Sequence, residues 1–132
     1  MSEQFGVAVK AIIKNKEEKF LIIFKSDIED INPNEIDIPG GRLKFGEEIY
    51  SGLKREVLEE TNLEIKILKQ SRVWSLVKGD LHLVGITFLA ELVDGVIRLS
   101  NEHDFYKWLP KEEILNGEYP DWIKEEFAEI QN

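Results

Sequence analysis

Residues 38–63 read IPGGRLKFGEEIYSGLKREVLEETNL, and this stretch decides the fold. From residue 47 to residue 61 it predicts one long helix, because apolar side chains recur at helical spacing at Ile49, Leu53 and Val57. The Gly40-Gly41 pair before the helix predicts a turn, in which backbone groups can approach a phosphate or a metal where a side chain would obstruct.

Three glutamates crowd one face near the end of this predicted helix. At about 100° per residue, Glu56, Glu59 and Glu60 fall within an arc of about 100°, with Glu60 at the seam beside the apolar stripe. Like charges at i,i+4 cost about 0.2–0.5 kcal/mol, and the helix C-terminus disfavours each anion by about 0.3–1 kcal/mol. A bound divalent cation offsets both costs and the desolvation of the seam, whereas the alternative is a solvated acidic patch.

The composition indicates one soluble globular domain over residues 1–132. The chain is 42% hydrophobic and 33% charged, and no stretch approaches the roughly 20 apolar residues of a membrane span. It has no cysteine, which excludes disulfides and thiol nucleophiles, and its N-terminus lacks a signal-peptide pattern, so we expect a cytoplasmic protein without membrane contact. The net charge of −9 repels nucleic-acid polymers, but divalent cations can bridge an acidic site to a small phosphorylated molecule.

The remaining elements predict an α/β (α+β) fold with a mixed β-sheet and a helix on each side. Alternation and turn signals predict strands at 6–13, 19–25, 36–38, 63–69, 71–77, 81–92, 96–99 and 105–109, the first two forming a hairpin. Helices are predicted from Pro110 to Leu115 and over residues 122–130.

The helix and its flanks match a known signature, G-x5-E-x7-R-E-U-x-E-E-x-G-U, where U is aliphatic. The matching residues, with every gap correct, are Gly41, Glu47, Arg55-Glu56-Val57, Glu59-Glu60 and Leu63. The chain therefore resembles the Nudix hydrolase superfamily, in particular its MutT-like members, and the resemblance implies an α/β/α sandwich. One position departs, because Asn62 stands where the pattern has glycine; asparagine tolerates the left-handed conformation best among the other residues.

The resemblance implies metal-dependent hydrolysis of a diphosphate linkage in a nucleoside diphosphate-linked compound, with Mg²⁺ or Mn²⁺ as cofactor. It assigns the metal to the carboxylates of Glu56, Glu59 and Glu60 and the carbonyl of Gly40, catalysis to Glu56, Arg55, Glu59 and Glu102, and supporting positions around them to Gly41 and Glu47. The general base stays open between Glu56 and Glu102.

The resemblance implies a small nucleotide as the substrate, and among the subfamilies a MutT-type nucleoside triphosphate is preferred by elimination. No proline lies between Pro39 and Pro110, unlike the pattern of ADP-ribose hydrolases. Asp121 is expected to accept hydrogen bonds from a base and Tyr119 or Trp122 to stack on it, whereas Trp74 and Trp108 are expected in the core. Alternatives are ADP-ribose, a nucleotide sugar or a dinucleoside polyphosphate, or a non-catalytic nucleotide-sensing domain. The resemblance also allows a homodimer.

Overall fold

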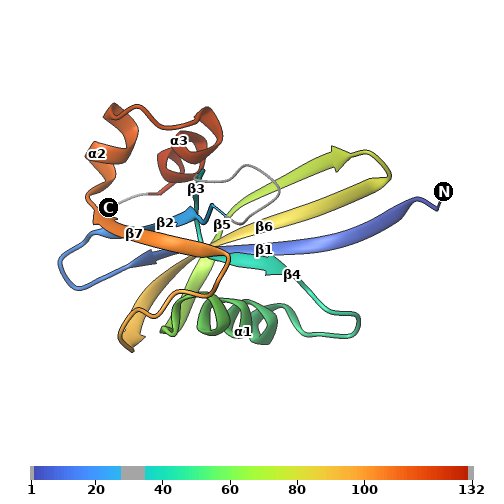
Figure 1. Ribbon diagram of the computed structural model, residues 1–132, viewed down its shortest axis with the longest axis horizontal. Coiled ribbons are helices and arrows are strands. Elements are labelled where there is room, and N and C mark those ends of the chain that lie inside the picture. Colours follow the sequence, from blue (N-terminus) through green and yellow to red (C-terminus); the bar gives the residue numbers. More distant parts are fainter. Residues whose placement is uncertain (1, 28–34, 131–132) are drawn as a thin grey trace.

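The computed structural model describes residues 2–27 and 35–130, and these form a mixed β-sheet with helices on both faces. The strands are β1 (Gln4–Lys14), β2 (Phe20–Lys25), β3 (Ile36–Asp37), β4 (Gly40–Arg42), β5 (Glu64–Lys78), β6 (Leu81–Asp94) and β7 (His103–Leu109). The helices are α1 (Ile49–Thr61), α2 (Lys111–Asn116) and α3 (Asp121–Ala128). Figure 1 shows α1 below the curved sheet and α2 and α3 above it, which confirms the predicted sandwich.

The sheet opens around β1, and this opening creates the place for the site. β1 pairs in parallel with β6 along its whole length, while β5 pairs antiparallel with β6. β1 and β2 form the predicted hairpin, but they share only the pair Lys14 and Phe20. Beyond that pair β4 adds to β1 and β3 adds to β2. The chain from β3 to β4 therefore lies between the two strands, which brings Gly40 opposite Lys10.

Two apolar clusters, one on each face of the sheet, hold the helices in place. The cluster under α1 contains Val9, Ala11 and Ile13 of β1 with Leu53 and Val57 of the helix. The cluster under α2 and α3 contains Ile12 of β1 with Ile114, Ile123 and Phe127. Neighbouring residues of β1 thus face opposite layers, as the period of two along a strand requires. Because burying one such side chain contributes about 1.5–3 kcal/mol, this packing orients α1.

The Gly40-Gly41 pair forms no turn, and this prediction was wrong. Gly40–Arg42 is strand β4, paired antiparallel with β1. Gly40 has a φ of +147°, and a Cβ built on it would lie 2.0 Å from the carbonyl oxygen of Val9. Glycine is therefore required here so that β4 can approach the backbone of β1.

Two other predicted boundaries differ from the structure. Residues 96–99 form no strand, because the amides of Arg98 and Ser100 bond to the carbonyls of Thr61 and Glu60 at the end of α1, which need partners. The two strands predicted at 63–69 and 71–77 are one bulged strand, β5. None of the helices within residues 2–27 and 35–130 has the length and apolar character to cross a membrane.

Candidate active site

Both ends of α1 are capped, which fixes the register of its acidic face. Glu48 accepts hydrogen bonds from the amides of Tyr50 and Ser51, each at 3.0 Å, so the helix begins two residues later than predicted. Asn62 ends it in the left-handed conformation, with φ 65°, and its amide donates to the carbonyl of Leu58. Its side chain also donates to the carbonyl of Val96 at 3.0 Å. The expectation for Asn62 is confirmed.

Glu56 lies against the backbone of β4. A Cβ built on Gly41 would stand 2.5 Å from Oε2 of Glu56, closer than real Cβ atoms approach. Glycine at position 41 therefore leaves the space that this carboxylate occupies. Burial raises the pKa of Glu56 above its usual value, and the carboxylates of Glu59 and Glu102 add to the rise against the opposing charge of Arg55.

Glu60 is buried at the seam between α1 and β4, as the helical wheel predicts. Its side chain is 9% exposed, and Oε1 accepts a hydrogen bond of 2.8 Å from the amide of Gly40. Burial raises the pKa of Glu60 to about 7, because desolvation outweighs the favourable charge of Lys10 and the Gly40 hydrogen bond. A carboxylate in this environment needs a cation or a proton.

Arg55 is the hub of the acidic face. Its Nε and Nη2 donate to Glu47 at 2.6 and 2.9 Å, while Nη1 lies 3.1 Å from Glu56 and 3.0 Å from Glu59. Glu47 in turn accepts the amide of Lys44 at 2.9 Å, which ties the loop before α1 to the helix. The hydrogen bonds from Arg55 lower the pKa of Glu47 to about 2. The structure thus brings these four predicted residues together.

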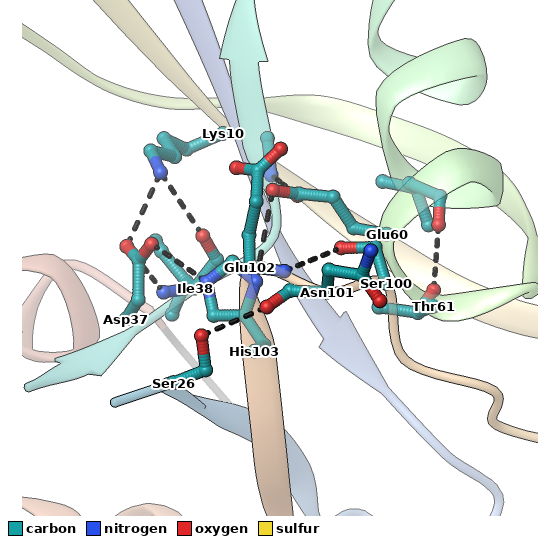
Figure 2. A network of polar contacts seen from close by, with 12 residues as sticks. Lys10, Ser26, Asp37, Ile38, Glu60, Thr61, Ser100, Asn101, Glu102 and His103 are labelled. Carbon is teal, nitrogen blue, oxygen red and sulfur yellow. Dashed lines mark hydrogen bonds and ion pairs between the residues drawn. The ribbon is translucent and has the colours of Figure 1, made fainter. Parts of the chain in front are cut away.

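A buried ion network connects Glu60 to the other face of β4, and the sequence did not reveal it (Figure 2). Nζ of Lys10 lies 3.2 Å from Oδ1 of Asp37 and donates to the carbonyl of Ile38. Nε2 of His103 lies 3.3 Å from Oδ2 of Asp37, and its Nδ1 lies 3.9 Å from Glu60. The available signal was a charged residue inside an apolar strand, at Lys10 and at Asp37 between two isoleucines.

The charges of this network support one another. Burial opposes ionisation of both partners, but Lys10 and His103 hold the pKa of Asp37 well below its usual range. The carboxylates of Asp37 and Glu60 likewise raise the pKa of Lys10 despite its burial. Lys10 is therefore a cation held close to the acidic face of α1.

Glu102 lies on the loop before β7, which is held beside β2. The amide of Ser26 donates to the carbonyl of Glu102 at 2.9 Å, and the Ser26 hydroxyl donates to the carbonyl of Asn101 at 2.8 Å. The carboxylate of Glu102 is near enough to contribute to the raised pKa of Glu56. This loop thus adds a fourth acidic side chain to the face of α1.

The residues present fit a hard divalent cation. The carboxylates of Glu56, Glu59, Glu60 and Glu102 and the carbonyl of Gly40 offer only oxygen donors, which Mg²⁺ and Mn²⁺ prefer. Burial raises the pKa of both Glu56 and Glu60, and a cation would relieve this cost of ionisation. Within the described part of the chain, no three acidic or histidine side chains already converge on one point, and Glu59 is held by Arg55.

Comparison with models of known protein families assigns the chain to one of them. The model of the NUDIX domain matches residues 4–129. The chain belongs to the NUDIX family. The predicted superfamily membership is thereby confirmed.

The NUDIX domain of this chain is similar to proteins with different names. It is 27% identical to Nudix hydrolase 5 of Arabidopsis thaliana over 124 residues, covering 86% of this chain but 39% of that protein. It is 30% identical to an ADP-ribose pyrophosphatase of Methanocaldococcus jannaschii over 101 residues, covering 74% and 57%. Among solved structures, a MutT protein from Methanosarcina mazei Go1 matches with a TM-score of 0.85 and 27% identity, covering 97% and 94%.

A cavity of about 510 Å³ lies on the opposite face of the sheet from α1 in this NUDIX domain, within the usual size range of ligand pockets. Trp74, Trp122 and the buried Glu126 line it together with three cations, Lys10, Lys25 and Arg72. Because Lys10 and Asp37 belong both to this lining and to the buried ion network, the cavity adjoins the acidic site.

The structure places Trp108 as expected but other aromatic residues differently from the expectation. Trp74 was expected in the core but is half-buried on the cavity wall, while Trp108 packs against the cluster under α1. Tyr119 packs against the cluster under α3, and Asp121 is exposed at the first residue of α3. Neither lines the cavity, so Trp122 is the aromatic residue of this segment that does.

Proposed function

We propose that this NUDIX domain hydrolyses a diphosphate linkage in a nucleoside diphosphate derivative with the aid of Mg²⁺ or Mn²⁺. The observation that carries the proposal is the close approach of the Glu56 and Glu60 carboxylates to the two glycines of β4, beside Glu59 and Arg55. Buried like charges are costly alone but suit a cation and a polyphosphate.

Each side chain has a task in this proposal. Glu56, Glu59, Glu60 and the Gly40 carbonyl hold the cation, which when bound polarises the phosphoryl group and neutralises its charge. Arg55 orients Glu56 and Glu59, and Glu47 keeps the guanidinium in place. Glu56 or Glu102 accepts the proton of the attacking water.

The cavity on the other face of the sheet is proposed to hold the organic part of the substrate. Trp74 and Trp122 offer aromatic surfaces for a base, and Lys10, Lys25 and Arg72 offer positive charge for phosphates. The lining also holds three carboxylates, those of Glu35, Asp37 and Glu126, which balance these cations, so the two aromatic surfaces carry the assignment of this cavity to the organic part of the substrate.

A nucleoside triphosphate, as in MutT-type enzymes, is the proposed substrate within this class. The support is the similarity to the M. mazei MutT protein over nearly the whole of both chains. The relative named ADP-ribose pyrophosphatase makes ADP-ribose the first competitor to test.

A panel of nucleoside triphosphates, ADP-ribose, nucleotide sugars and dinucleoside polyphosphates, assayed with Mg²⁺ for released phosphate or pyrophosphate, tests the proposal. Glu59→Gln and Glu60→Gln are expected to lower turnover at least about 100-fold with the fold intact. Glu64→Gln makes the same chemical change at an exposed residue of β5 and keeps turnover. Nucleotide binding without turnover, or full activity in both site variants, would overturn the proposal.

A further inference from the structure

Trp74 lies flat on the sheet and forms one wall of the cavity. A Cβ built on Gly85, its cross-strand neighbour on β6, would stand 2.1, 2.2 and 2.3 Å from three atoms of the indole. Three nearly equal distances mean that the ring faces the Gly85 backbone rather than pointing an edge at it. One face of the Trp74 indole covers Gly85, and Trp74 also borders the cavity. Trp74 is thus built as a platform for a flat ligand.

The indole N–H of Trp74 begins a relay of two hydrogen bonds, and in each bond the donor is fixed by the chemistry of the groups. Nε1 of Trp74 can only donate, and it donates to the hydroxyl oxygen of Thr87 at 3.1 Å. The one proton of the Thr87 hydroxyl then goes to Oε2 of Glu126 at 2.8 Å. The relay therefore sets Oε2 of Glu126 as an acceptor from Thr87.

The other carboxylate oxygen of Glu126 is left over. The residue is 2% exposed, and among the described residues its Oε1 has no hydrogen-bond partner. Arg72 does not supply one, because its Nη2 donates to Glu125 at 2.8 Å and its Nη1 lies 3.7 Å from Oε2 of Glu126. A buried acceptor without a donor costs about 1–3 kcal/mol, and Glu126 lines the cavity one helical turn after Trp122.

We propose that Glu126 accepts a hydrogen bond from the exocyclic amino group of a base stacked on Trp74, so that the protein prefers amino-bearing bases to their oxo counterparts. This inference rests on the proposed function, since it names the feature by which the cavity selects its nucleotide. A site built to bond a donor rejects the analogue that lacks it, because its own buried group is then unpaired. Burial also raises the pKa of Glu126, which makes a donor from the ligand more valuable to the ionised form.

Binding of nucleoside monophosphates by calorimetry tests this without hydrolysis. AMP against IMP and CMP against UMP are pairs in which an oxo group replaces the amino group and the adjacent ring nitrogen gains a proton. The protein is expected to bind the amino member of each pair roughly tenfold or more tightly. In Glu126→Gln the preference should reverse, because the amide oxygen takes the proton of Thr87 and the NH₂ group then stands where Oε1 was.

Glu125→Gln is the matched control, since this neighbouring glutamate is exposed and bonds to Arg72. It should keep the preference for the amino member. Thr87→Ser, which retains the hydroxyl relay, should also keep it, whereas Thr87→Val should lose it and alter Trp74 fluorescence. If Glu126→Gln does not fold, this Thr87 pair carries the test.

No preference in the unsubstituted protein, no binding of any monophosphate, or an unchanged preference in folded Glu126→Gln or Thr87→Val would overturn the proposal. Hydrolysis without base preference would overturn the role of Glu126 and leave the proposed function intact. A base preference without hydrolysis would do the reverse.

Discussion

At the level of single residues, Glu60 is the carboxylate of the site whose burial most disfavours its ionised form. Its carboxylate is buried at the seam between α1 and β4 and accepts one hydrogen bond from the amide of Gly40. Burial raises its pKa from 4.5 to about 7. Below about pH 7 the folded protein therefore prefers Glu60 in its protonated form, whereas in the unfolded chain this carboxyl group already ionises near pH 4.5.

The pH dependence of stability should report this difference. A raised carboxyl pKa contributes stability below pH 4.5 that is lost as the pH rises to about 7. At 1.36 kcal/mol per unit, the loss is up to about 3 kcal/mol. Glu60→Gln cannot ionise at this position and has no such loss. Urea titrations in the presence of a chelator should therefore show its free energy of unfolding rising relative to that of the unsubstituted protein between pH 4.5 and about 7. Parallel curves for the two proteins would refute the buried ionisation, and Glu64→Gln serves as the exposed control.

At the level of elements, α1 could be predicted because its signals are local. The apolar spacing and the glutamates lie within one helix, and its observed start at Ile49 is two residues after the predicted one. The role of Gly40 could not be predicted, because its positive φ serves the approach of β4 to β1, a contact 30 residues apart in the chain. Residues 96–99 likewise failed as a strand because the end of α1 takes their amides.

The cap at Asn62 should show this dependence on element ends. Asn62→Ala should lower the free energy of unfolding by about 1–2 kcal/mol. Position 62 has the left-handed conformation, and alanine lacks the polar side chain by which asparagine tolerates it. It also loses the bond to the carbonyl of Val96. Asn62→Gly should cost less, since glycine adopts this conformation freely. Thermal denaturation of both variants measures the difference, and equal losses would contradict the conformational argument.

At the level of the whole molecule, the site depends on strands that are distant in sequence. Lys10, Asp37 and His103 come from β1, β3 and β7 and meet behind Glu60. The sequence showed each only as an isolated charge or a loop histidine, because nothing local specifies which strands become neighbours. Trp74 was misplaced for the same reason, since an alternating strand does not show which of its faces is covered. The acidic half of the site was predictable, and the cavity half required the fold.

Binding of Mn²⁺ tests most directly whether the carboxylates of α1 form a cation site. Electron paramagnetic resonance counts free Mn²⁺ during a titration, without nucleotide or turnover. The unsubstituted protein and Glu64→Gln should bind Mn²⁺ equally at millimolar concentrations, and Glu59→Gln and Glu60→Gln should bind it at least about tenfold more weakly. No binding by the unsubstituted protein, or equal binding by all four, would contradict the account.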